Sequence, residues 1–185
     1  MKRRDAVRKL LSNRKGLLVV AGLGSTAWDC TAAGDSPLTF PMWGAMGQAA
    51  MMGLGLALAQ PKRRVLVITG DGEALMGLGA LATIGVQQPP NLTVVVIDNE
   101  RYGETGMQKT HTASGIDLEG VAKSCRMNVV GWKNLQAAIH KQRGPHFAVV
   151  KVDAEKIPLV LPPREGALLK ARFRRALLGA KADSV

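Results

Sequence analysis

Two short polar motifs, separated by 25 residues, carry the most specific chemistry of this 185-residue chain. Gly70-Asp71-Gly72 follows the β-branched segment 64–69, and Asp98-Asn99 follows the similar segment 92–97. Both segments are almost continuously apolar, as is typical of parallel strands covered on both faces. Parallel strands end at one edge of the sheet, so we expect Asp71 and Asn99 to lie close together. Their oxygens are ligands that Mg²⁺ prefers, commonly together with phosphate oxygens.

The elements that must position these motifs alternate between strand and helix. We expect strands at 16–21, 64–69, 92–97, 129–130 and 147–152. We expect a helix opening near residue 25, further helices at 5–12, 45–59, 73–88, 117–126 and 134–142, and irregular segments at 29–41 and 100–115. A last, basic helix after residue 163 carries an apolar stripe of Leu168, Leu169, Phe173, Leu177 and Leu178. The pattern predicts an α/β fold, a three-layer and mostly parallel sheet with helices on both faces.

Length and composition favour one domain, residues 1–185, with its core at about 16–152. Of the formal charge of +11, residues 1–15 contribute +6 (seven Lys/Arg, one acid) and residues 162–185 contribute +4 (six Lys/Arg, two acids). Aromatic residues make up 4%, and no nucleic-acid-binding motif is present. The basic terminal segments therefore indicate solvated helices, or alternatively a tail that docks on an acidic partner subunit. Two cysteines and no secretion signal favour a reduced, cytoplasmic setting.

The two motifs resemble the cofactor signature of thiamine diphosphate-dependent enzymes, in which Gly-Asp-Gly is followed at this distance by Asn-Asn. Asp98 stands where the first Asn is usual. The resemblance implies thiamine diphosphate and Mg²⁺ as cofactors. It assigns the metal ligands to Asp71, Asn99 and the backbone carbonyl of Arg101.

The segment Trp43–Gln48 is similar to the part of this family that binds the pyrimidine ring of the cofactor. The resemblance implies that Gly44 accepts a hydrogen bond from the 4'-amino group through its carbonyl. It assigns Met46 as the apolar wedge that bends the cofactor, so that its amino group reaches the reacting carbon. Gly44 and Met46 are therefore the candidate catalytic positions.

Other glycine-rich loops are candidates for the diphosphate. Gly24 and Ser25 open a helix after a strand, and helix N-termini bind phosphate through free N–H groups. Gly72 and Glu73 open the next helix, with Glu73 standing where many relatives carry a small hydroxyl residue. Gly70, Tyr102 and Gly103 complete the predicted cofactor-binding set.

Enzymes of this family also need a glutamate from a separate pyrimidine-binding domain, and a chain of this length has no room for one. The segment 98–108 is most similar to the β subunits of sulfopyruvate decarboxylases and to phosphonopyruvate decarboxylases. The resemblance implies the small subunit of a 2-oxo acid decarboxylase, a hetero-oligomer in which an α-type subunit donates the glutamate. Substrates of this subgroup carry a second anionic group, for which Lys109 is a candidate contact. The loop residues Glu104, Thr105 and Gln108 are candidates to close over the site, and His111 to meet the substrate.

Three other functions remain open at this point. The first is other thiamine diphosphate chemistry, such as acyloin synthesis, and the second is a non-catalytic cofactor-binding module. The third is a nicotinamide oxidoreductase, because Gly22-x-Gly24-x-x-Ala27 has the form of a dinucleotide fingerprint. Against it, no acidic residue ends a second strand about 20 positions further on.

Overall fold

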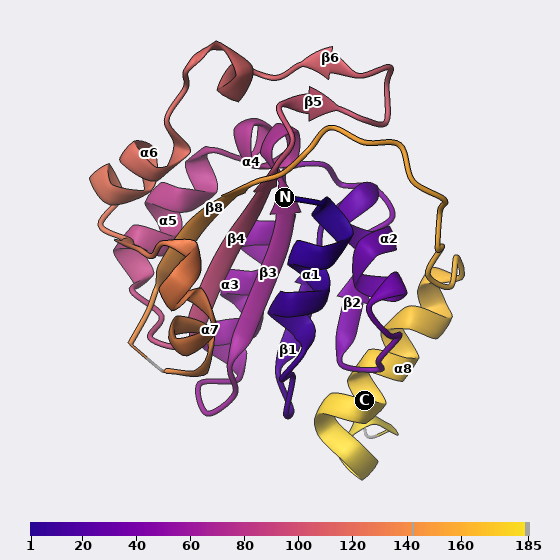
Figure 1. The fold of residues 1–185 in the computed structure, drawn as a ribbon. Coiled ribbons are helices and arrows are strands. Elements are labelled where there is room, and N and C mark those ends of the chain that lie inside the picture. Colours follow the sequence, from indigo (N-terminus) through magenta and orange to yellow (C-terminus); the bar gives the residue numbers. More distant parts are fainter. Residues whose placement is uncertain (142, 184–185) are drawn as a thin grey trace.

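The computed structural model describes residues 1–141 and 143–183. Within them, six parallel strands form one sheet in the order β2-β1-β3-β4-β8-β7 (Figure 1). The strands are β1 Leu18–Ala21, β2 Thr39–Pro41, β3 Val65–Gly70, β4 Leu92–Asp98, β7 Asn128–Val129 and β8 His146–Lys151. Outside this sheet, β5 (Arg101–Tyr102) and β6 (Gln108–Lys109) form an antiparallel hairpin. The predicted parallel α/β fold is confirmed.

Helices connect the strands and cover both faces of the sheet (Figure 1). They are α1 Arg3–Leu11, α2 Ser25–Ala32, α3 Ala49–Ala59, α4 Asp71–Met76, α5 Gly79–Gln87, α6 Leu118–Ser124, α7 Trp132–His140 and α8 Gly166–Leu178. Two 3₁₀ turns, η1 His111–Ser114 and η2 Gly179–Asp183, complete the set. Among the described residues, no helix is long and apolar enough to cross a membrane.

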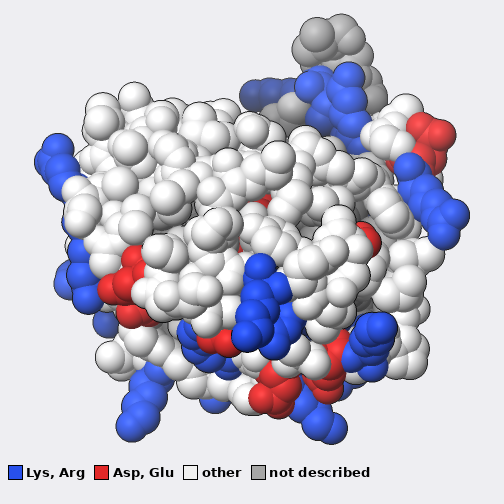
Figure 2. All heavy atoms as spheres, turned by 90° about the horizontal axis from the view of Figure 1, so that it is seen from above, with Lys and Arg blue, Asp and Glu red and all other residues white. Residues whose placement is uncertain are grey.

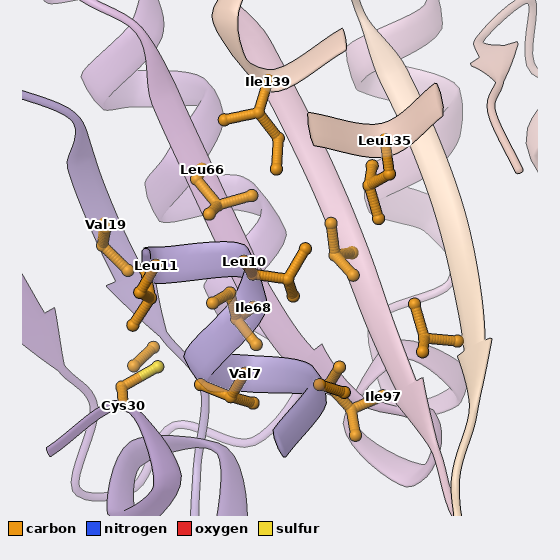
Figure 3. Close-up of a cluster of buried hydrophobic side chains, with 14 of the residues drawn as sticks. Val7, Leu10, Leu11, Val19, Cys30, Leu66, Ile68, Ile97, Leu135 and Ile139 are labelled. Carbon is orange, nitrogen blue, oxygen red and sulfur yellow. The ribbon is translucent and has the colours of Figure 1, made fainter. Parts of the chain in front are cut away.

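The alternation of side chains along each strand produces two separate apolar cores. On one face, Leu10 of α1 and Leu135 of α7 pack in a cluster with Ile68 of β3 (Figure 3). On the other face, Leu54 of α3 packs in a cluster with Val67 of β3. The central strands are buried on both sides, which explains why their sequences read as continuous apolar runs.

The direction in which the sheet grows reverses between β1 and β3. The chain passes from β1 through α2 to β2 at one edge, whereas β3 and β4 extend the sheet the other way. In open α/β sheets, ligands bind beyond the carboxyl ends of the strands at such a reversal. The loops after β1 and β3 flank this position, and the first residues of α1 lie at the same edge (Figure 1).

The segment 29–41, expected to be irregular, contains regular structure at both ends. Helix α2 continues to Ala32 because Asp29 is a buried partner of Arg3 and Arg4, and the chain turns at Gly34 with φ of +116°. Residues 39–41 form the edge strand β2, which pairs with β1. The expected irregular connection is therefore wrong, except between these two elements.

Two expected helices differ from the structure at the point where their backbones meet. The helix expected from residue 45 begins at Ala49, because Ala45 and Gly47 have φ of 53° and 89°. The single helix expected at 73–88 is divided into α4 and α5 near Gly77. A Cβ at Gly77 would collide with the carbonyl of Gly47, so this close approach requires glycine.

Smaller corrections concern the loop regions and the chain ends. The segment 100–115, expected to be a loop, contains the β5–β6 hairpin and η1. Leu168 does not belong to the buried stripe of α8, because 54% of its surface is exposed, whereas Leu169 and Phe173 are buried. The expected helix 134–142 corresponds to α7, and its last expected residue, 142, lies outside the described residues.

Candidate functional site

A pocket of about 500 Å³ lies over the carboxyl ends of β3 and β4 and beside the loop after β1. Ten of the twelve predicted cofactor residues line it: Ser25, Met46, Gly70, Asp71, Gly72, Glu73, Asn99, Arg101, Tyr102 and Gly103. Gly24 directly precedes the lining residue Ser25. Gly44 does not line the pocket, so the structure does not bring this candidate catalytic position to the cavity wall.

Asp71 is the first residue of α4 and is 1% exposed. Its Oδ2 accepts a hydrogen bond from the hydroxyl of Thr110 at 2.5 Å, and the hydroxyl oxygen of Thr112, whose shorter contact is with Asp98, lies 3.3 Å away. Burial raises the pKa of the Asp71 carboxyl, the Thr110 hydrogen bond opposes this shift, and the nearby Asp98 adds to it. Among the described residues Asp71 forms no ion pair, so a divalent cation would offset its buried negative charge.

Asp98, at the end of β4, is also 1% exposed, and its charge is compensated locally. The ammonium of Lys151 lies 2.8 Å from Oδ2, and Oδ1 accepts from Thr112 at 2.9 Å and from the backbone N–H of Glu100 at 3.0 Å. Burial lowers the pKa of Lys151, but its hydrogen bonds to Asp98 and Glu100 raise it more. This network lets an aspartate occupy the position at which an asparagine is usual.

Asn99 forms a tight turn that folds the chain back over the end of β4. Its Oδ1 accepts from the backbone N–H of Arg101 at 3.0 Å, and β5 begins at that residue. The resulting donor set consists of a carboxylate, an amide oxygen and a backbone carbonyl, which are the hard oxygen ligands suited to Mg²⁺. The residues present therefore fit a magnesium ion that shares a phosphate. The described part of the chain contains no group of three His, Cys, Asp or Glu side chains that could hold a metal ion.

Glu73 connects three segments around the pocket. Its Oε2 accepts from the hydroxyl of Thr69 at 2.8 Å and from the backbone N–H of Leu23 at 3.1 Å. Burial raises the pKa of this carboxyl, and its hydrogen bonds to Thr69 and Leu23 oppose the shift. Glu73 therefore ties the loop after β1 to the end of β3, and its Oε1 is buried without a hydrogen-bond partner among the described residues. Its role toward a cofactor stays a prediction.

The start of α2 lies beside the pocket and close to the hairpin. Gly24 has φ of 71° and precedes Ser25, the first residue of the helix. A Cβ at Gly24 would lie 2.6 Å from a carboxyl oxygen of Glu104, so the hairpin side chain reaches this helix end. Burial raises the pKa of Glu104, against the attraction of Arg3, which lowers it.

Met46, Gly72 and Tyr102 meet on the wall of the pocket. A Cβ at Gly72 would lie 2.5 Å from the Tyr102 ring and 3.6 Å from the Met46 methyl group. Glycine at position 72 therefore lets the hairpin approach α4. Met46 is half-buried and faces the cavity, in agreement with a role that requires contact with a ligand.

Sequence reasoning missed several contributors. The buried Thr110 and Thr112 gave no recognisable signal, because threonines in a polar segment resemble loop residues. Arg3 also lines the pocket, and its place on the stripe of buried α1 positions (3, 6, 7, 10 and 11) was a usable signal. Of the loop candidates, Glu104, Thr105 and His111 line the cavity, whereas Gln108 and Lys109 do not.

Comparison with known proteins identifies the family. The model of the thiamine pyrophosphate enzyme C-terminal, cofactor-binding domain matches residues 24–152. The β subunit of sulfopyruvate decarboxylase from Methanothermobacter thermautotrophicus is 37% identical over 186 residues, covering 99% of each chain. The corresponding subunit from Methanocaldococcus jannaschii is 40% identical and covers 73% of this chain and 72% of that protein.

Two larger proteins match this chain over part of their length. Phosphonopyruvate decarboxylase from Streptomyces viridochromogenes is 41% identical over 68% of this chain and 31% of that protein. The thiamine diphosphate-dependent 4-hydroxybenzoylformate decarboxylase of Rhodococcus jostii RHA1 superposes with a TM-score of 0.65, at 17% identity, over 85% of this chain and 33% of that one. The structural match supports the fold alone, whereas the family model and the sequence relatives identify the family. The chain belongs to the thiamine pyrophosphate enzymes and carries their C-terminal cofactor-binding domain.

Proposed function

We propose that this chain is the small subunit of a thiamine diphosphate- and Mg²⁺-dependent 2-oxo acid decarboxylase, with a sulfonated or phosphonated 2-oxo acid as substrate. The relatives that match over most of this chain are sulfopyruvate decarboxylase β subunits, which supports the assignment. The observation that carries it is the convergence of Asp71, Asn99 and Arg101 on one pocket at the reversal of the sheet. We further propose that residues 1–185 form one domain of a cytoplasmic enzyme.

The residues of the pocket have separable tasks in this proposal. Asp71, Asn99 and the carbonyl of Arg101 hold the metal, and the N-terminal ends of α2 and α4 hold the diphosphate. Met46 supports the bent cofactor, and Gly44 offers its carbonyl from the preceding turn. When bound, thiamine diphosphate supplies the nucleophilic carbon and the electron sink that 2-oxo acid decarboxylation needs. The buried threonines keep the Asp71 carboxylate oriented before the metal arrives.

The chain supplies half of such a site, and the open half has the character of an interface. Met76 at the pocket rim is 68% exposed, and Met51 in the first turn of α3 is 37% exposed. Figure 2 looks down on the carboxyl edge of the sheet: uncharged residues cover most of the upper part of that face, and charged side chains gather in its lower part and along its border. A pyrimidine-binding α-type subunit would cover this face and donate the activating glutamate. The word "subunit" in the names of the relatives supports a heteromer.

The first experiment is a calorimetric titration of thiamine diphosphate, with and without Mg²⁺, into the wild type, Asp71→Ala and Asp5→Ala. Binding should require Mg²⁺, and Asp71→Ala should weaken it at least about tenfold because a charged ligand to the metal is lost. Asp5 is exposed on α1 and pairs with Arg8, so its variant serves as the matched control.

The same titration with the α-type subunit present should give tighter binding, followed by release of CO₂ from sulfopyruvate or phosphonopyruvate. Equal affinity with and without Mg²⁺, or an Asp71→Ala variant that binds like Asp5→Ala, would show that the metal assignment is wrong. Cofactor binding by the assembled complex without turnover of any 2-oxo acid would instead favour a non-catalytic module.

A further inference from the structure

Arg3 is a buried cation in the wall of the cofactor pocket. It is the first residue of α1, far in sequence from the signature motifs, and its side chain is 8% exposed. The pocket that it lines is also lined by Ser25 at the start of α2 and by Glu104 of the hairpin. A guanidinium at this depth is costly unless its donors are satisfied.

Of the three guanidinium nitrogens of Arg3, only Nε has a hydrogen-bond partner among the described residues. Its Nε donates to Oδ2 of Asp29 at 2.5 Å, and Asp29 is fully buried. Within the described residues, the two terminal nitrogens of Arg3 make no hydrogen bond, and neither of them is sealed from solvent. They therefore have access to solvent at a residue that lines the pocket.

The charge around Arg3 is unbalanced. Oδ1 of Asp29 accepts from Nε of Arg4 at 3.0 Å, so two guanidinium groups share one carboxylate. Nη2 of Arg4 donates to the carbonyl of Pro158 at 2.8 Å, and Arg4 does not line the pocket. The carboxylate of Glu104 on the hairpin is attracted to Arg3, but the two side chains form no ion pair within 4 Å.

We propose that Arg3 binds an oxyanion of the ligand held in this pocket through its two terminal nitrogens. The planar guanidinium fork matches phosphate, phosphonate and sulfonate oxygens, and a position fixed by Asp29 reduces the entropy lost on binding. This inference rests on the proposed function and leaves two sources for the anion. They are the diphosphate of the cofactor and the second anionic group of the substrate.

The test compares Arg3→Gln and Arg3→Lys with Arg4→Gln. Arg4→Gln is the matched control, because it removes the same charge and the other Asp29 contact without changing the pocket wall. Calorimetry measures the affinity for Mg²⁺–thiamine diphosphate. Steady-state kinetics of the complex with the α-type subunit measure KM for sulfopyruvate and for pyruvate, which lacks the second anion.

If the anion is the diphosphate, Arg3→Gln should weaken cofactor binding at least about tenfold, as expected for a lost charge-assisted hydrogen bond. If the anion is the second anionic group of the substrate, Arg3→Gln should bind the cofactor as tightly as the wild type does. Its KM for sulfopyruvate should then rise about tenfold, and its KM for pyruvate should not change. Arg3→Lys, which keeps the charge, should lose less in either case and provides the measurement should Arg3→Gln fail to fold.

Two results would overturn the inference. In the first, both Arg3 variants have the same cofactor affinity and the same KM as Arg4→Gln. Arg3 would then have no part in anion binding, and the proposed function would still stand. A wild type that neither binds Mg²⁺–thiamine diphosphate nor decarboxylates a 2-oxo acid with its partner would remove the proposed function and this inference together.

Discussion

Asp98 shows how a single residue can depart from a signature without losing its place in the fold. A buried aspartate carries a charge that an asparagine would not. In this protein Lys151 forms an ion pair with that carboxylate, and Thr112 donates a hydrogen bond to it. Both partners come from elements remote in sequence from the motif. A substitution that looks conservative in the linear signature is therefore part of a three-residue network.

This network predicts a coupling that can be measured. Lys151→Met should destabilise the protein by about 1–2 kcal/mol, because the buried Asp98 carboxylate loses a charged partner. In an Asp98→Asn background the same change should cost less than about 0.5 kcal/mol, since no charge is left to compensate. Urea denaturation of the four proteins gives the coupling energy. Equal costs in the two backgrounds would mean that the pair contributes nothing.

For individual site residues, the sequence predicts those that belong to the cofactor signature and few others. Asp71, Asn99 and Met46 could be found because residues of these types seldom occur together at this spacing by chance. Thr110 and Thr112 could not be found, because nothing local separates a threonine that orients a carboxylate from one in a solvated loop. Lys109 was a reasonable candidate by charge, yet the hairpin register places it away from the cavity.

At the scale of elements, α8 covers the edge of the sheet that β2 would otherwise expose. The Phe173 ring packs edge-on against Phe40, with ring centroids 5.6 Å apart and planes at 78°. Arg172 adds two hydrogen bonds to the carboxylate of Asp35 at 2.5 and 3.0 Å. The contacts that attach the basic C-terminal segment thus include an aromatic pair, the buried Leu169 and the ion pair between Arg172 and Asp35.

We expect Phe173→Ala to release α8 while the sheet stays folded, because the helix loses the larger of its two buried side chains, Leu169 and Phe173. Hydrogen exchange should show a loss of protection of about a hundredfold in residues 166–178 and none in β3 or β4. Leu168→Ala is the control, since that neighbouring side chain is 54% exposed. A loss spread evenly over the central strands would mean that α8 and the sheet unfold as one unit.

Strands and most helices were predictable because apolar periodicity is a local signal. The start of α3 and the break between α4 and α5 were not, because one contact between the backbones of Gly47 and Gly77 determines both. That contact joins two segments thirty residues apart in the chain. A glycine-rich stretch of sequence permits such an approach without indicating where its partner lies.

For the molecule as a whole, His146 couples stability to pH. It is 8% exposed at the start of β8, its Nδ1 has no hydrogen-bond partner among the described residues, and burial lowers its pKa. The unfolded chain, with a histidine pKa of about 6.5, therefore binds a proton before the folded protein does. Its contribution to stability is complete above about pH 6.5 and is lost as the pH falls further.

The free energy of unfolding should accordingly fall between about pH 7 and pH 5, and this fall should be shallower in His146→Met. Denaturant titrations at several pH values provide the measurement, and His111→Met, a change at an exposed histidine, is the control. A pH dependence identical in wild type and His146→Met would assign the effect to other groups, among them His140, whose pKa burial also lowers.

The reversal of the sheet between β1 and β3 also determines when the pocket forms during folding. The pocket draws its walls from α1, from the loops after β1, β3 and β4, and from the hairpin. None of these pieces is complete until the parallel strands have paired, and such long-range pairing is slow. A molecule that binds there recognises only the finished sheet, so its binding free energy adds to the stability of the entire fold. The cofactor would then act as the last structural part of the protein as well as its reagent.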